Sequence, residues 1–213
     1  MVKGTNEMTS LSTLARAARL GSTRKRGVTL IEAVLYISIA LALIVGGLVF
    51  FQQASLAQRT NSAVRNISAM ASESRGLFAQ QNSFDGLSPA ALINAGAVPT
   101  SLISGTDLKN EWGGTVAIAT TGVGDLHSGF TVAYPALPRA ACVRLTNTDA
   151  SGSGRVGSGI RSIAFKAPSA ATYGTAVTPA SSSGAAQLTP ALVSGSTMCG
   201  LGDVVDVQFT FNR

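Results

Sequence analysis

The sequence predicts an α+β fold in which one long N-terminal helix packs on an antiparallel β-sheet. A helical period of apolar residues continues without interruption over residues 29–79. The second half of this helix is amphipathic and needs a partner surface, and four later segments have the composition of β-strands that can supply it. A helix lying on such a sheet is an α+β arrangement.

The net charge of the chain is concentrated at its N-terminus. The 213 residues carry a net charge of +6. Six cations and one carboxylate give residues 1–27 a charge of +5, which leaves +1 for residues 28–213. The later part has no Lys/Arg stripe interleaved with aromatic residues, so the sequence predicts no nucleic-acid partner.

Residues 28–51 form an apolar run that follows the last cations of this basic leader. As a helix, 24 residues are about 36 Å long, enough to span a bilayer. Cations before such a run stay cytoplasmic, which places the chain after residue 52 on the outer side. The run exceeds the ~7–15 residues of a signal-peptide core. Cleavage after Ala57 in Ser55-Leu56-Ala57, releasing a secreted enzyme or binding protein, remains a remote alternative.

Glu32 is the one charge between Val28 and Arg59. It could be a tolerated anchor residue that snorkels, since a charge at the centre of a membrane helix costs ~2.5–3.5 kcal/mol and less near the interface. Alternatively, Glu32 could acquire a partner by processing. Cleavage after Gly27 would free the α-amino group of Val28, and the amine of one subunit could neutralise Glu32 of the next inside an apolar bundle.

The stretch RKRGVTLIEAVLYISIALAL, which begins at Arg24, resembles the prepilin signature of type IV pilins. The resemblance implies cleavage after Gly27 by prepilin peptidase, N-methylation of Val28, and a role for Glu32 in subunit registration. It also implies the pilin fold. The long leader, the long mature chain and the start at Val28 are most like type IVb major pilins of the bundle-forming, toxin-coregulated and thin-pilus type.

Weaker resemblance to the bundle-forming type extends over residues 77–99, 111–119 and 139–145. One feature departs from the family. Many pilins have a proline about twenty residues into this helix, whereas here no proline occurs between residues 28 and 88. Gly46 and Gly47 lie near that position, and we expect them to supply the flexibility of the helix.

The helix is expected to have two halves with different surroundings. Residues 28–51 are apolar all round and must be buried by lipid before assembly and by other copies afterwards. Residues 52–80 place Gln53, Arg59, Arg65 and Glu73 away from an apolar stripe. That stripe is expected to pack on the head and consists of Leu56, Ala63, Ile67, Met70, Ser74 and Leu77.

Residues 81–213 are expected to form the head. Strands are predicted at 114–119, 129–134, 160–166 and 204–211. The last has Val205, Val207, Phe209 and Phe211 on one face and Asp206, Gln208 and Thr210 on the other. Short helices are predicted at 88–95, with Ser88 as N-cap, Pro89 at its first position and Gly96 after it, and at 137–147.

Two cysteines, Cys142 and Cys199, lie 57 positions apart in the head. A metal site is poorly supported because His127 is the one histidine of the chain. An exported location favours a disulfide, with unpaired core cysteines as the alternative. A bridge would close the region 142–199, much of which is expected to have little core of its own, and could contribute roughly 4 kcal/mol.

The remaining motifs do not predict catalysis or a cofactor. Gly152-x-Gly154-x-x-Gly157 has the spacing of a dinucleotide fingerprint, but it does not follow a strand or open a helix, so a flexible loop is expected. Asp203 and Asp206 are weak evidence for calcium, and we expect no metal site. No nucleophile has an identifiable base and orienting acid. The chain is therefore not expected to be an enzyme.

The predicted function is that of a structural subunit, the major pilin of a type IVb pilus that serves adhesion, aggregation or conjugative mating. The implied partners are other copies in a helical homopolymer, prepilin peptidase, the inner-membrane assembly machinery and an outer-membrane secretin. The implied location is the inner membrane and then the extracellular filament of a Gram-negative bacterium. A minor pilin or a type II secretion pseudopilin is the alternative, although pseudopilins usually lack such a disulfide loop.

Overall fold

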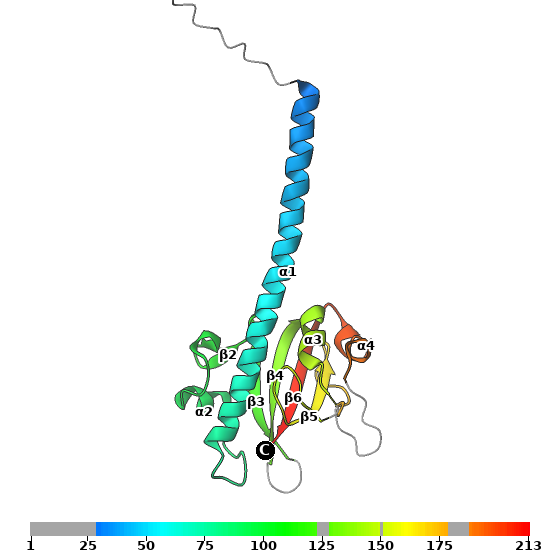
Figure 1. Cartoon of the computed structure of the whole chain (residues 1–213). Helices are drawn as coiled ribbons and strands as arrows, with labels where there is room; N and C mark the ends of the chain where they lie inside the picture. Colours follow the sequence, from blue (N-terminus) through cyan, green and yellow to red (C-terminus); the bar gives the residue numbers. More distant parts are fainter. Residues whose placement is uncertain (1–28, 123–127, 150, 179–187) are drawn as a thin grey trace, which may run out of the picture. The chain divides into compact units, whose positions relative to one another are not determined.

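The structure, a computed structural model, describes residues 29–122, 128–149, 151–178 and 188–213. The chain divides into two compact units, Met1–Leu48 and Val49–Arg213. The first described element, helix α1 (Leu30–Leu77), contributes residues to both units. All the strands and the other helices belong to the second unit, and they confirm the predicted α+β class (Figure 1).

Helix α1 is 48 residues long and agrees closely with the predicted 29–79. The Thr29 hydroxyl caps its start by accepting a hydrogen bond from the Glu32 N–H at 3.4 Å. No proline interrupts the following turns, so the hydrogen-bond ladder continues until Leu77. Gly76 weakens the last turn, and the chain then leaves the helix in a turn.

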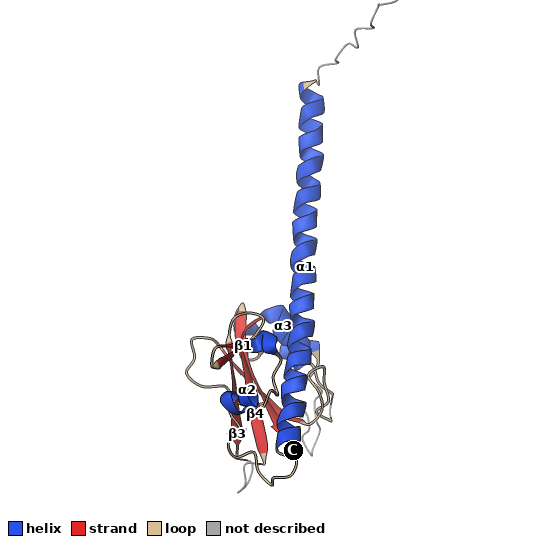
Figure 2. Ribbon diagram, turned by 90° about the vertical axis from the view of Figure 1, so that its left-hand side faces the viewer, coloured by secondary structure: helices blue, strands red, loops and turns tan. Residues whose placement is uncertain are grey.

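Within the second unit, α1 lies across one face of the sheet, as Figures 1 and 2 show. The prediction for this stripe is wrong at Leu77, which is 44% exposed, because α1 ends there and Phe78 packs on the core in its place. Leu56 is only partly buried. The buried side chains repeat every three or four residues and are Thr60, Ala63, Ile67, Met70, Ala71 and Ser74.

The sheet is antiparallel throughout, with the strand order β1-β2-β3-β4-β6-β5. Its two shortest strands were not predicted, because two or three residues are too few to show alternation. The six strands are β1 (Ile103–Ser104), β2 (Asp107–Lys109), β3 (Thr115–Thr121), β4 (Gly129–Pro138), β5 (Ile160–Lys166) and β6 (Val204–Asn212).

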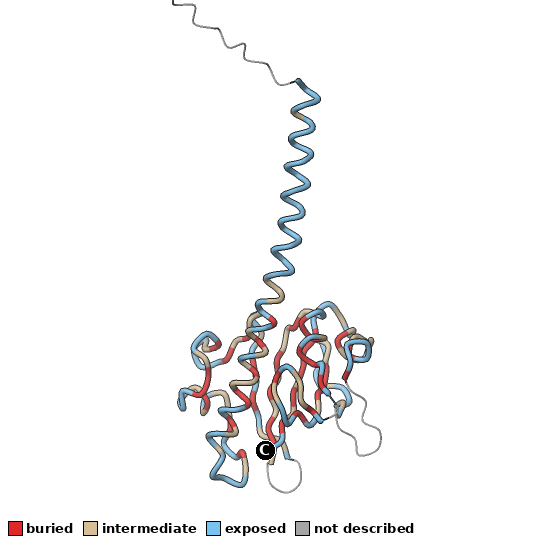
Figure 3. The backbone as a smooth tube through the Cα atoms, viewed as in Figure 1, coloured by how far each residue is buried: buried red, intermediate tan, exposed pale blue. Residues whose placement is uncertain are grey.

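Strand β6 has the predicted apolar face, and its four side chains, those of Val205, Val207, Phe209 and Phe211, are fully buried. Phe130 of β4 pairs with Phe211 of β6, and the two rings stack with centroids 5.3 Å apart. The sheet face that carries these rings therefore forms the core with the stripe of α1. Figure 3 shows the buried segments of α1 and of the strands in red.

Asp206, which was expected on the polar face of β6, is nevertheless buried. One carboxylate oxygen accepts a hydrogen bond from the Ala136 N–H at 2.9 Å, and the other lies 3.4 Å from the Lys166 ammonium. Ala136 has a φ of 60° and lies at an irregularity in the register of β4. Asp206 thus stabilises a β-bulge, which offsets the cost of burying its charge.

The short helices were predicted nearly in place. Helix α2 (Pro89–Asn94) has the predicted cap, since the Ser88 hydroxyl accepts from the Ala91 N–H at 3.2 Å. Helix α3 (Arg139–Thr146) lies within the predicted 137–147. Three short pieces were not predicted, namely η1 (Thr100–Leu102), α4 (Pro190–Val193) and η2 (Cys199–Leu201).

The glycine-rich loop at 151–159 has more structure than expected. The Asp149 carboxylate accepts hydrogen bonds from the Ser151 hydroxyl and from the N–H groups of Ser153 and Ser151, which lower the pKa of Asp149. Val156 is fully buried against the core. The expectation of little core in the region 142–199 is therefore wrong here, and also at Leu188 and Val193, which are fully buried.

Arg75 fastens the end of α1 to the sheet and to this loop. Its guanidinium donates to the Asn212 carbonyl at 3.1 Å and to the Ser158 carbonyl at 3.0 Å. It also lies 5.5 Å from the ring centroid of Phe211. Burial lowers the pKa of Arg75. Gly159 has a φ of 76°, which favours glycine, and a Cβ there would lie 2.7 Å from the guanidinium.

Glu111, which lies in the connection between β2 and β3, holds α1 to the sheet at a second place. Its carboxylate accepts a hydrogen bond from the Asn66 amide of α1 at 2.6 Å and another from the Tyr134 hydroxyl of β4. Burial, together with the neighbouring Glu111, raises the pKa of Tyr134 well above its usual value, so the hydroxyl keeps its proton. The two bonds fix the rotation of α1 about its axis on the sheet.

We predict that Arg75→Ala lowers the free energy of unfolding by about 2–3 kcal/mol, because two carbonyls lose a charged donor and two rings lose a cation. Arg65→Ala is the matched control on the exposed face of α1 and should change it by less than ~0.5 kcal/mol. Guanidinium unfolding of the detergent-solubilised chain, followed by Trp112 fluorescence, measures both. Equal midpoints for the two variants would contradict the role of Arg75.

Candidate functional site

The first unit presents an apolar surface on every side of its helix. The large apolar side chains from Leu30 to Leu48 are between 50% and 84% exposed. By length and hydropathy this part of α1 is able to cross a membrane. We call the side chains of residues 30–48 the assembly surface (pale blue on the upper tube of Figure 3). Such a surface requires a cover of lipid or of other protein chains.

Glu32 is the one charged side chain of the assembly surface. It is exposed, and its carboxylate accepts a hydrogen bond from the Tyr36 hydroxyl, one turn along the helix, at 3.4 Å. A neutral donor at this distance orients the carboxylate but does not cancel its charge. Once the surrounding side chains are covered, Glu32 needs a cation. Gly27 and Val28, the predicted cleavage site, lie outside the described residues.

Gly46 and Gly47 remain within the regular part of α1. A side chain at either position would meet no heavy atom within 4 Å, so close packing inside the single chain does not require glycine there. Each glycine makes the helix less stable than alanine would, by roughly 0.5–1 kcal/mol. Their predicted role in helix flexibility is compatible with this weakness and remains a prediction.

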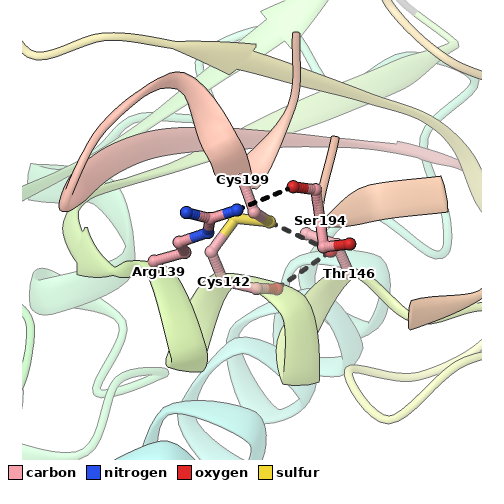
Figure 4. Close-up of a disulfide and its surroundings, with 5 residues drawn as sticks. All are labelled: Arg139, Cys142, Thr146, Ser194 and Cys199. Carbon is pink, nitrogen blue, oxygen red and sulfur yellow. Dashed lines mark hydrogen bonds between the residues drawn. A yellow bond between two sulfur atoms is a disulfide. The ribbon is translucent and has the colours of Figure 1, made fainter. Parts of the chain in front are cut away.

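Cys142 and Cys199 form a disulfide, which confirms the predicted pairing and excludes unpaired cysteines. The Cα atoms are 5.7 Å apart and both residues are fully buried. The bridge joins α3 to η2, as Figure 4 shows. Two hydrogen bonds support it, from the Thr146 hydroxyl to the Cys142 carbonyl at 2.9 Å and from the Arg139 guanidinium to the Ser194 carbonyl at 3.1 Å.

The described part of the chain contains no group of three or more His, Cys, Asp or Glu side chains placed to hold a metal ion. The two carboxylates considered for calcium do not form such a group, and Asp206 already pairs with Lys166. His127 lies outside the described residues.

A family model described as PilS N terminal matches residues 57–212, about three quarters of the chain. The chain belongs to the PilS family of type IV pilins. The predicted membership of the type IV pilin family is thereby confirmed. The match begins after the assembly surface, so it rests on the head and on the amphipathic half of α1 rather than on the prepilin signature.

Similar proteins include the major structural subunit of bundle-forming pilus from Escherichia coli O127:H6 (strain E2348/69 / EPEC). This pilin is 29% identical to it over 164 residues, which cover 73% of this chain and 84% of that protein. The subunit of the same name from Escherichia coli O111:H- matches equally, at 29% over 164 residues, 73% of this chain and 84% of that protein. Both are filament subunits by name.

Among solved structures, TcpA, a type IV pilin from Vibrio cholerae El Tor biotype, matches with a TM-score of 0.52 at 13% identity, over 72% of this chain and 98% of that chain. A type IV b pilin from Salmonella typhi matches with a TM-score of 0.46 at 21% identity, over 70% and 97%. The former shows that the pilin fold is shared. Pilins are structural subunits that associate with one another, and this pilin is therefore not an enzyme.

Sequence reasoning missed the polar residues that fix α1 on the head, above all Glu111. The stretch 111–119 was identified only by its resemblance to other pilins. Its sequence does not indicate that Asn66 and Tyr134 bind the Glu111 carboxylate. The one signal available in the sequence was that Glu111 lies next to Trp112, the one tryptophan of the chain.

We predict that Cys199→Ser lowers the stability of the subunit, by up to about 4 kcal/mol on the chain-entropy model, and lowers filament yield. The loss should be smaller than this limit, because buried apolar residues also hold the bridged region. Unfolding midpoints and the amount of sheared filament measure the two effects. Cross-linked peptides in a non-reducing digest check the bridge, and two freely alkylated thiols in native filaments would contradict it.

Proposed function

We propose that this pilin is the major subunit of a type IVb pilus, a surface filament for adhesion, aggregation or conjugative mating. The observation that carries the proposal is the assembly surface, an apolar helical segment with one carboxylate, in a chain whose remainder is a pilin head. The relatives named as major subunits support the choice of a major pilin over a minor pilin or pseudopilin. Abundance in sheared surface material would distinguish these classes.

Before assembly, the precursor is held in the inner membrane by residues 28–51, with the basic leader 1–27 on the cytoplasmic side. Prepilin peptidase removes the leader after Gly27 and methylates the new amine at Val28. The inner-membrane assembly machinery then adds the subunit to the fibre, which leaves the cell through the outer-membrane secretin. The segments 28–51, 52–80 and 81–213 thus act as anchor, head attachment and head.

Release by cleavage after Ala57 has less support. Ser55, Leu56 and Ala57 lie inside α1, and Leu56 packs against the core of the second unit. A peptidase would have to unwind several turns of helix to reach this bond.

We predict that the mature chain begins at an N-methylated Val28, because Gly27 allows the backbone to enter a peptidase site in an extended form. Terminal sequencing and intact mass of the filament protein test this. Gly27→Leu should leave uncleaved precursor in the inner membrane. A mature chain that begins at Gln58 would contradict the proposal.

We predict that Glu32→Ala is cleaved normally but assembles poorly. In the filament the Val28 amine of a neighbour would be left without its counter-charge in an apolar bundle, a penalty of ~3–5 kcal/mol for a broken buried pair. Glu32→Gln, which keeps the size of the side chain and a hydrogen-bond acceptor for Tyr36, should fail in the same way.

The matched controls are Arg65→Ala and Glu73→Ala, both on the exposed face of α1, where charge pairs contribute only ~0–1 kcal/mol. A gel shift scores cleavage and shearing scores the filaments of each variant. Normal filaments from Glu32→Ala would mean that Glu32 is a tolerated anchor residue and that the pairing mechanism is wrong.

A further inference from the structure

A groove of about 310 Å³ lies in the second unit, between α1 and the connection from β2 to β3. One wall consists of the α1 side chains that directly follow the apolar run, Gln52, Ser55, Leu56 and Arg59, with Phe51 at the end. Trp112 and Pro138 form the other wall. The lining contains one cation and no carboxylate.

Arg59 is exposed, and it makes no hydrogen bond or ion pair with any residue in the described ranges. This distinguishes it from Arg75, Arg139 and Arg155, which all donate to neighbouring oxygens. An unpaired guanidinium beside an aromatic wall is suited to an anion, and its planar donors match the oxygens of a phosphate.

Trp112 is half-buried, and its position is fixed by its neighbours. Its backbone N–H donates to the Asn110 side chain at 3.0 Å, and the adjacent Glu111 is held by Asn66 and Tyr134. The backbone that carries the indole is therefore held beside the groove, which Trp112 lines. Tryptophan with one apolar side and one polar edge is favoured at membrane–water interfaces.

The height of the groove along α1 indicates its ligand. The apolar run ends at Phe51, and the Cα of Arg59 lies about 12 Å further along the helix axis. Helical side chains point back toward the N-terminus, which brings the guanidinium to the level of Ser55 and Gln52. A headgroup layer extends about 5–8 Å beyond the hydrocarbon. The groove therefore lies at headgroup depth when residues 28–51 occupy a bilayer.

We propose that this groove binds the phosphate of an anionic phospholipid headgroup in the outer leaflet of the membrane that holds the unassembled subunit. Arg59 donates to the phosphate, and Trp112 and Phe51 contact the glycerol and the first methylenes of the acyl chains. The lipid fixes the depth of the subunit before it is added to the fibre. This inference rests on the proposed function, because it requires that residues 28–51 are held in a bilayer.

The test uses the full chain, inserted as one copy per nanodisc, and takes advantage of Trp112 being the one tryptophan of the chain. A lipid with a nitroxide on its headgroup should quench Trp112 more strongly than a lipid with a nitroxide in the middle of its acyl chain. Aqueous iodide should quench it weakly. Inorganic phosphate, added to the detergent-solubilised chain, should leave its emission unchanged.

Arg59→Gln tests the phosphate contact, and Arg65→Gln is its matched control on the same helix. As phosphatidylglycerol replaces phosphatidylcholine in the disc, the emission of Trp112 should shift. The phosphatidylglycerol fraction needed to reach half of this shift should be about five-fold higher in Arg59→Gln than in the unaltered chain. This is the effect of losing one cation near an anionic leaflet. The fraction should not change in Arg65→Gln.

Three results would overturn the inference. Trp112 that is fully quenched by iodide in the disc would mean that the groove faces water. If Trp112 is protected from iodide only when a disc holds two or more copies, the groove is occupied by a second copy of the chain and not by lipid. Equal responses of the two glutamine variants would exclude Arg59 as the phosphate donor. A chain that does not float with lipid at all would instead contradict the proposed function, and the site with it.

Discussion

The structure depends on one constraint, that a helix with apolar residues on every side cannot be buried by its own chain. Twelve large apolar side chains between Leu30 and Leu48 are at least half exposed. Removing them from water contributes about 1.5–3 kcal/mol for each fully buried side chain, so even partial burial exceeds the few kcal/mol that a charge costs near a membrane interface. The free energy gained by burying the apolar side chains is therefore large enough to remove this segment from water. The cost of removing the Glu32 carboxylate from water is too small to prevent this, and in the proposed assembly Glu32 selects the partner.

The second half of the same helix solves the opposite problem, because it must hold a head on one face and leave the other face polar. Small side chains at Ala63, Ala71 and Ser74 allow the helix to approach the sheet closely, and Ile67 and Met70 fill the core. Apolar packing alone would let such a helix rotate or slide. The polar contacts of Glu111 and Arg75 prevent this, because each connects α1 to specific atoms of the sheet or its loops. Packing supplies stability, and the charged contacts supply position.

Periodic features could be predicted from the sequence, and features that depend on distant partners could not. The long helix, strand β6 and the Ser88 cap follow from local patterns and were placed to within a few residues. Strands β1 and β2 are too short to carry a pattern. Alternation assigned Asp206 to the polar face, but it does not reveal that the residue is buried as the acceptor for the bulge at Ala136. The groove beside Trp112 combines residues more than fifty positions apart, so no local signal could indicate it.

Glu32, near the start of the apolar run, and Arg59, beyond its end, have complementary roles in the proposed assembly. Glu32 has no cation until a processed neighbour brings its amine, whereas Arg59 has its phosphate only while the subunit remains in the membrane. Moving an apolar helix from lipid into a bundle of identical helices yields little hydrophobic gain, since lipid tails are as apolar as leucine. The free-energy difference between the subunit in the membrane and the subunit in the fibre then depends on close packing and on these polar contacts. The Glu32 pair must contribute more than the Arg59 contact that is given up, and it can do so because it is buried, where the interaction of opposite charges is stronger than at the wet headgroup surface.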